Sequence, residues 1–143
     1  MSKITMNAMR RSLLAGAAGL VLAAGAQAQG TLKIGEINSY KAQPAFLEPY
    51  KKGMELAVDE INASGGLLGR KVELLTRDDN ANPGDAVRAA EELLTREKVD
   101  VLTGSFLSNI GLALTDFAKQ KKTFFLAGEP LTDKIVWADG NRY

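Results

Sequence analysis

From about residue 30 onward, apolar residues follow two spacings in turn: short extended runs, and longer stretches with an apolar residue every three or four positions. The extended runs predict strands at 31–38, 71–77, 99–103 and 123–127. The helical spacing predicts helices at 50–62, from 82 to about 97, and from 110 to about 119. The strands are mostly apolar instead of alternating, as in a parallel sheet with helices on both faces. The predicted fold class is therefore α/β, a doubly wound parallel sheet.

Helix signals support these bounds. Asn82, Pro83 and Asp85 form a capping residue, a first-turn proline and a first-turn acid, and a double glycine at 65–66 ends the preceding helix. The apolar stripe of the first helix is Tyr50, Met54, Ala57, Val58 and Ile61; that of the second is Ala86, Ala89, Ala90, Leu93 and Leu94.

The N-terminus resembles an export signal. Three basic residues precede an apolar run at 13–26, and Ala26-Gln27-Ala28 fits a cleavage site, so we expect a signal peptide at 1–28 that is cut after Ala28. This apolar run is too short, and contains too many glycines, to be a membrane anchor. Arg10 and Arg11 leave both the general and the twin-arginine export routes open. We expect a periplasmic location for the mature chain.

Composition narrows the function. The chain of 143 residues has no His and no Cys, which excludes Ser-His-Asp and thiolate catalysis, and we expect no enzyme. Without the three basic residues of the signal, the 18 Lys and Arg fall to 15 against 17 Asp and Glu, a charge that does not suit nucleic acid. The oxygen-rich segment 78–85 lacks the glycine and distal glutamate of a calcium loop, and the glycines at 65–69 lie at the wrong end for a dinucleotide. We expect no metal and no cofactor.

A ligand of such a sheet binds at the carboxyl ends of the strands, here in the loops 39–49, 104–109 and 128–133. With strand order 2-1-3-4, the first and third strands flank the point where the connections change face. Ser105, Ser108 and Asn109 stand where a helix begins, and its free amides and dipole would hold a carboxylate. The alternative is that Ser108 or Asn109 only caps the helix.

Three further residues are candidates at the same rim. Glu129 follows the fourth strand and could pair with an ammonium or accept from a hydroxyl, or could simply be a solvated acid. Tyr40 and Phe46 lie in the long first loop and could cover an apolar ligand, although ordinary packing explains them equally well.

Several segments carry a family resemblance: Gly53 to Asn62 with the glycine turn at 65–69, then Arg77-Asp78-Asp79-Asn80 followed by Pro83 and Ala86-Val87. They resemble the periplasmic solute-binding proteins of ABC importers, in the leucine/isoleucine/valine-binding, type I group. The resemblance implies a two-lobed receptor at least twice this length, so that 29–143 is the first part of an incomplete N-terminal lobe.

The resemblance also assigns roles. In the family a serine after the third strand grips an amino acid's carboxylate, and Ser108 matches it; Phe46 lies near an aromatic lid position and Tyr40 near a small residue. The segment 127–132 departs from the small-residue and threonine pattern of the family's amino-acid binders. The resemblance implies a branched-chain amino acid, and Phe46, Phe106 and Leu107, if they line the crevice, extend this to a related small carboxylate, including an aromatic one. The resemblance implies an importer permease as partner and a monomer at full length; the alternative is a sensory ligand-binding domain of the same fold.

Overall fold

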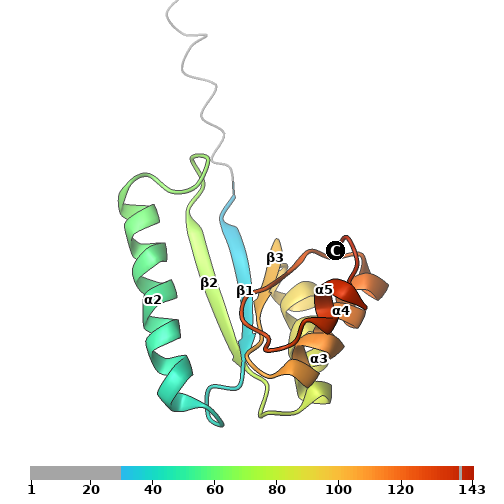
Figure 1. Ribbon diagram of the computed structural model, residues 1–143. Coiled ribbons are helices and arrows are strands. Elements are labelled where there is room, and N and C mark those ends of the chain that lie inside the picture. Colours follow the sequence, from blue (N-terminus) through green and yellow to red (C-terminus); the bar gives the residue numbers. More distant parts are fainter. Residues whose placement is uncertain (1–29, 139) are drawn as a thin grey trace, which may run out of the picture.

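The computed structural model describes residues 30–138 and 140–143, so the predicted signal peptide lies outside the described residues. Its sheet contains β1 (Leu32–Asn38), β2 (Val72–Asp78), β3 (Val101–Gly104) and β4 (Phe125–Ala127). All neighbouring strands are parallel, and their order is β2-β1-β3-β4 (Figure 1). The predicted fold class and strand order are confirmed.

Helices cover both faces of the sheet. Helix α2 (Pro44–Ala63) lies on one face, whereas α3 (Pro83–Glu92) and α4 (Ser108–Lys121) lie on the other (Figure 1). The chain moves from β1 outward to β2 and then returns past β1 to β3 and β4. Because parallel crossovers are right-handed, this reversal places the connecting helices on opposite faces. The carboxyl ends of β1 and β3 therefore flank the point where the connections diverge.

One helix begins well before its predicted start. Helix α2 begins at Pro44, six residues before the predicted start, so that most of the predicted loop 39–49 is helical. Pro44 suits the first helical position, where its missing N–H is not needed, and Leu47 in the same turn is fully buried. Pro49, the last residue of the predicted loop 39–49, is accommodated inside α2.

The other helix ends follow the predicted signals more closely. The side chain of Asn82 accepts from the amides of Gly84 and Asp85 at 2.8 and 3.1 Å, which confirms the predicted cap of α3. The helix continues to Glu97 as predicted, but its last five residues form a π-helix, η1 (Leu93–Glu97). Beyond β4 the structure adds α5 (Lys134–Trp137), which the sequence pattern did not predict.

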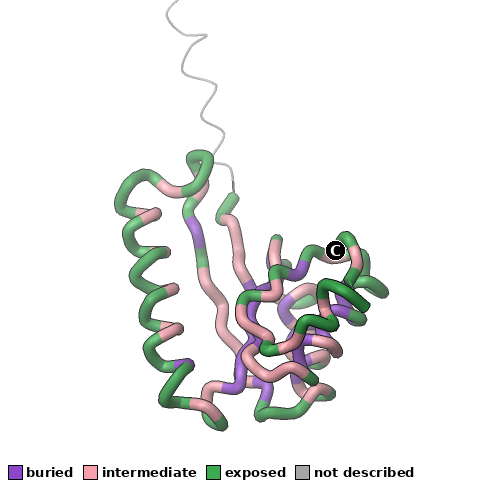
Figure 2. Tube along the Cα trace, viewed as in Figure 1, coloured by how far each residue is buried: buried purple, intermediate pink, exposed green. Residues whose placement is uncertain are grey.

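The apolar core lies between the sheet and the α3/α4 layer (Figure 2). Its buried members are Ile37, Ala86, Ala90, Leu93, Val99, Leu102, Ile110, Leu114, Phe117, Ala118 and Phe125. Burial of this kind is the main source of stability. No helix within the described residues has the length and apolar character needed to cross a membrane.

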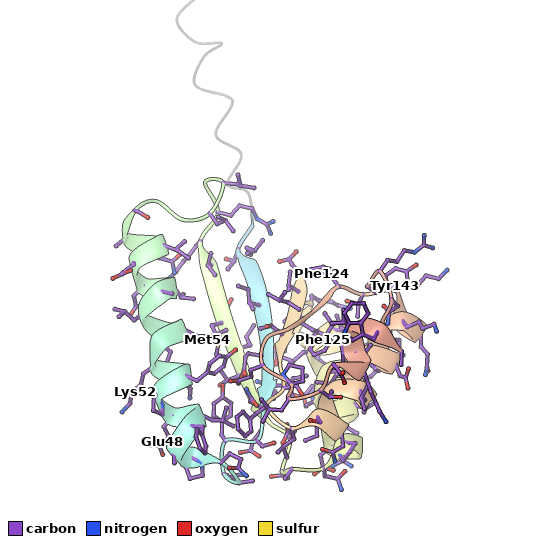
Figure 3. The ribbon with its side chains drawn as sticks, in the orientation of Figure 1. Glu48, Lys52, Met54, Phe124, Phe125 and Tyr143 are labelled. Carbon is purple, nitrogen blue, oxygen red and sulfur yellow. The ribbon has the colours of Figure 1, made fainter. Side chains whose placement is uncertain are left out.

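Helix α2 is held less tightly. Leu47 is its one buried residue, and the predicted stripe is only half-buried, with Ala57 exposed. Met54 points toward the sheet while Lys52 points away (Figure 3). The Asn62 side chain compensates: its amide donates to the Val72 carbonyl and its oxygen accepts from the Val72 N–H, both at 2.8 Å. These two bonds fasten the end of α2 to β2.

Candidate functional site

The two faces of β1 have opposite character. Gly35 and Ile37 face the core, where a Cβ on Gly35 would lie 3.0 Å from Leu93. Because side chains alternate along a strand, Glu36 and Asn38 face the α2 side. Glu36 pairs in register with Thr76 on β2 and Thr103 on β3, which places a polar row across the sheet near the carboxyl ends of its strands.

Glu36 is completely buried in this row. One of its oxygens accepts from Asn38 Nδ2 at 3.0 Å, and the other accepts a short hydrogen bond from the Tyr40 hydroxyl. Burial raises the pKa of Glu36 from 4.5 to about 7, against the opposing effect of these two donors. Burial and the neighbouring carboxylate likewise raise the pKa of Tyr40, which keeps its hydroxyl protonated as a donor.

Asn38 joins three segments of the chain. Its Nδ2 donates to Glu36 and also to Glu129 Oε1, the latter at 2.8 Å. Its Oδ1 accepts from the backbone amides of Ser39 and Phe106, at 3.2 and 2.8 Å. The end of β1, the loop after β3 and the loop after β4 are thereby fixed to one side chain.

Two glycines bring the same loops together. Gly104 ends β3 with φ of +116°, and a Cβ there would lie 2.3 Å from the Ile37 carbonyl oxygen. Its own carbonyl accepts from the Gly128 amide at 3.2 Å. On α4, a Cβ on Gly111 would lie 2.7 Å from Pro130, so that the loop carrying Glu129 packs against the first turns of this helix. Glu129 and the start of α4 consequently share one rim of the sheet.

The start of α4 lacks a side-chain cap. The N-cap position is held by Leu107, so the alternative that Ser108 or Asn109 caps the helix is wrong. Ser108 is half-buried and Asn109 exposed, and their backbone amides have no hydrogen-bond partner among the described residues. The amides of Ile110 and Gly111 turn back to the Leu107 carbonyl. Two free amides at a helix N-terminus favour an anion.

Ser105 lies in the turn between β3 and α4, ahead of the helix start where it was expected. It is fully buried with φ of +73°, and its hydroxyl donates to the Leu107 carbonyl at 3.2 Å. Its amide donates to the Ile37 carbonyl at 2.9 Å. With both groups used, Ser105 shapes the turn between β3 and α4.

An aromatic pair stands beside this turn. The rings of Phe46 and Phe106 are stacked with centroids 5.5 Å apart and planes 19° apart. Phe46 lies on α2 and not in a loop as predicted, and it is 63% exposed. The structure thus brings four predicted site residues from separate segments together around Glu36 and Asn38. They are Phe46, Phe106, Tyr40 and Glu129.

Sequence reasoning missed Glu36, Asn38 and Tyr50. Tyr50 belongs to the predicted apolar stripe, but its hydroxyl approaches Gly128, where a Cβ would lie 3.3 Å from it. Burial raises the pKa of Tyr50 to about 12, with Glu36 and Glu129 adding to the effect. The available signal was Glu36 itself, because an acid inside a strand covered on both faces is rarely placed there without a specific partner.

The two acids at the end of β2, Asp78 and Asp79, support a turn. Asp79 is buried, and its Oδ1 accepts from the Ser39 hydroxyl and the Ala81 amide at 2.7 and 2.8 Å. Burial raises the pKa of Asp79. Asp78 accepts from the Asn80 amide at 2.7 Å. Within the described residues no cluster of His, Cys, Asp or Glu could hold a metal ion.

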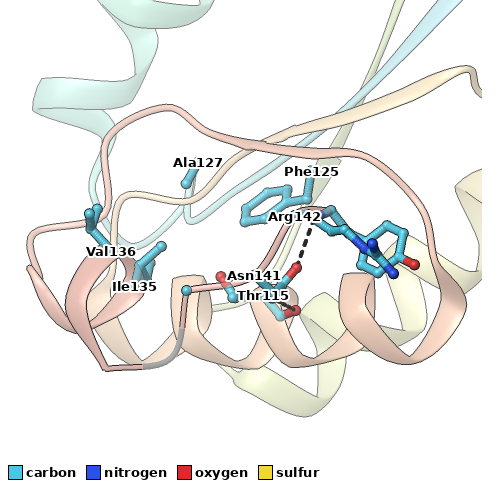
Figure 4. A pocket seen from close by; sticks show the side chains of 9 residues that line it. Thr115, Phe125, Ala127, Ile135, Val136, Asn141 and Arg142 are labelled. Atoms are coloured by element: carbon cyan, nitrogen blue, oxygen red, sulfur yellow. Dashed lines mark hydrogen bonds between the residues drawn. The ribbon is translucent and has the colours of Figure 1, made fainter.

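A separate pocket of about 440 Å³ lies between β4, α4, α5 and residues 140–143 (Figure 4). It is lined by Thr115, Phe125, Ala127, Ile135, Val136, Gly140, Asn141, Arg142 and Tyr143. Asn141 donates to the Thr115 carbonyl there and accepts from the Tyr143 amide. None of the predicted site residues lines it. The switch point of the sheet and the converging polar groups coincide instead at the rim formed by the ends of β1 and β3, which is the candidate site.

Comparison with known proteins bears on this arrangement. Residues 31–142 match the periplasmic binding protein family. The chain belongs to this family. A Leu/Ile/Val-binding protein homologue of Brucella melitensis is 32% identical over 132 residues, which are 92% of this chain and 31% of the relative.

Solved structures of periplasmic binding proteins agree. A solute-binding protein of an ABC transporter from R. palustris, in complex with benzoate, is 30% identical with a TM-score of 0.68, covering 77% of this chain and 30% of that one. A branched-chain amino acid transporter substrate-binding protein from Streptococcus pneumoniae, in complex with isoleucine, is 29% identical with a TM-score of 0.66, covering 72% and 30%. The chain spans about a third of the length of these relatives.

Proposed function

We propose that residues 29–143 are the first part of the N-terminal lobe of a periplasmic solute-binding protein that serves an ABC importer. The solute is a branched-chain amino acid or a related small carboxylate, including an aromatic one. The observation that carries this proposal is the pair of free amides at Ser108 and Asn109, which lies at the same rim as the Phe46–Phe106 stack. Relatives with isoleucine and with benzoate support the two solute types.

Each part of the site has a role in binding. The amides and side chains of Ser108 and Asn109 receive the carboxylate, with the α4 dipole favouring its negative charge. Phe46 and Phe106 cover the apolar body of the solute, and Tyr40 closes the side next to Glu36. Ser105, whose groups are used internally, supports the turn and makes no contact with the solute. Glu129 lies across the rim from the carboxylate position.

In this proposal the protein works by a shift of population between an open and a closed form. A solute that contacts this lobe and a second lobe stabilises the closed form over the open form, and the importer's permease recognises the closed form. No catalytic step and no cofactor are needed. The export signal at 1–28, cut after Ala28, delivers the protein to the periplasm, where it acts as a monomer; nucleic acid is not a partner.

Thermal-shift measurements on the complete gene product test this function. Branched-chain amino acids, aromatic acids and their amides are added at concentrations well above the expected Kd, because a ligand at 100 Kd stabilises by about 2.7 kcal/mol. We expect carboxylates to raise the unfolding temperature and the matched amides to have little effect. No stabilisation by any carboxylate would refute the proposal.

A further inference from the structure

Glu129 has one oxygen bound to the protein and one without a partner. Its Oε1 accepts from Asn38 Nδ2 at 2.8 Å, whereas Oε2 has no hydrogen-bond or ion-pair partner among residues 30–138 and 140–143. We propose that Glu129 selects solutes that carry a hydrogen-bond donor, a hydroxyl or an ammonium, in addition to their carboxylate, and that Asn38 is the residue that positions it. This inference rests on the proposed function and specifies the solute class of that site.

Glu36 cannot take this role. It is completely buried, and both of its oxygens already accept hydrogen bonds, from Asn38 and Tyr40. Glu129 is partly exposed and has an acceptor to spare. Of the two carboxylates that Asn38 bridges, Glu129 is therefore the one that can meet a solute.

Asn38 fixes the direction of the Glu129 carboxylate. Both of its amide hydrogens and its oxygen are occupied, by Glu36, Glu129 and the amides of Ser39 and Phe106. A side chain with this many partners has little freedom to rotate. It holds the Glu129 carboxylate on the rim that also carries the free amides of α4.

The charges around the pair favour a donor. No Lys or Arg forms an ion pair with Glu36 or Glu129 among the described residues; Lys51, which lies 5.8 Å from the Tyr40 ring, pairs with Glu55. Two carboxylates bridged by a neutral amide thus lack a counter-charge. A hydroxyl or ammonium supplies the missing partner, whereas a second carboxylate at this point would be repelled.

Two matched pairs of solutes test the inference by calorimetric titration of the complete gene product. Isoleucine is compared with 3-methylpentanoate, which lacks the ammonium, and 4-hydroxybenzoate with benzoate, which lacks the hydroxyl. The site is expected to accept the aliphatic or the aromatic apolar part, and the pair that binds is the one that tests the inference. Within that pair, we expect the member with the additional donor to bind about 10- to 100-fold more tightly, the size of one hydrogen bond to a charged group.

Glu129→Gln then tests the assignment. Its amide oxygen keeps the bond from Asn38, but its NH₂ replaces the free acceptor with a donor. We expect the preference within the pair to fall below about threefold, while the affinity for the member without the donor changes by less than about twofold. Asp133→Asn, an exposed acid in the same segment, is the matched control and keeps the preference. Asn38→Ala should lose the preference as Glu129→Gln does.

The outcomes are distinct. If both members of a pair bind equally well to the unaltered protein, or if Glu129→Gln keeps the preference, the inference is wrong and the proposed function stands. If no member of either pair binds, the proposed function fails and this inference fails with it. Should Asn38→Ala not fold, Glu129→Gln still decides the question.

Discussion

Glu36→Gln is the substitution whose effect the structure specifies most closely. The carboxyl group is completely buried, and burial raises its pKa from 4.5 to about 7. A glutamine fits the same contacts, because its oxygen accepts from Asn38 and its NH₂ donates to the Tyr40 hydroxyl. The substitution therefore removes the titration and keeps the shape and the bond from Asn38, while the bond with Tyr40 reverses its direction.

The sign and size of the effect follow from linkage. Because the native state binds this proton more tightly than the unfolded state does, unfolding releases a proton between pH 4.5 and about 7. The free energy of unfolding then falls as pH rises through this window and levels off above it. A difference of about 2.5 pKa units at 1.36 kcal/mol each gives a loss of about 3 kcal/mol. Glu36→Gln should lack this loss and be more stable than the unaltered protein by about 1–3 kcal/mol at pH 8.

Urea unfolding of the complete gene product from pH 4 to pH 8, followed by circular dichroism, measures the effect. The difference between the two proteins isolates Glu36, since Asp79 and other titrating groups are common to both. Glu48→Gln, an exposed acid on α2, is the control for removing one negative charge. Parallel pH profiles for Glu36→Gln and the unaltered protein would show that Glu36 does not titrate with a raised pKa.

Three further substitutions test other parts of the account. Ser108→Ala should weaken solute binding by about 1–3 kcal/mol in calorimetry and leave stability unchanged, since its side chain makes no hydrogen bond within the described residues. Ser64→Ala, just after the distant end of α2, is the control and should leave solute binding unchanged; equal losses of stability and binding in Ser108→Ala would point to a structural role. Asn62→Ala should lower the free energy of unfolding by about 1–3 kcal/mol, because it leaves two backbone groups of β2 without partners; an unchanged urea midpoint would contradict this. Gly111→Ala should destabilise by about 1–3 kcal/mol and also weaken binding, since the added methyl displaces the loop that carries Glu129; unaltered unfolding would show that the contact relaxes freely.

The fold was largely predictable because its signals are local. The apolar runs at 31–38 and 99–103, the Asn82 cap and the paired glycines after α2 each depend on neighbours along the chain. The start of α2 was not predictable in the same way. Leu47 is fully buried in that turn and Phe46 stacks on Phe106, and this burial and this long-range contact are not visible in the local sequence.

Some residues of the candidate site were also predictable from local signals, and others were not. Ser108, Asn109 and Glu129 were found because each follows a strand, and strand ends gather at one rim. Whether they face a ligand remains a prediction. Glu36 and Asn38 were missed because their importance comes from register and from a hydrogen bond spanning 91 positions, which no local pattern reveals.

The central claim is that the solute binds where the loops after β1, β3 and β4 meet. Hydrogen exchange by mass spectrometry, on the complete gene product with and without a stabilising carboxylate, tests it most directly. We expect slower exchange in peptides covering 105–110 and 128–131, with little change around Thr115 and Phe125. Protection confined to Thr115, Phe125 and 140–143 would instead place the solute in the pocket beside β4 and contradict the account.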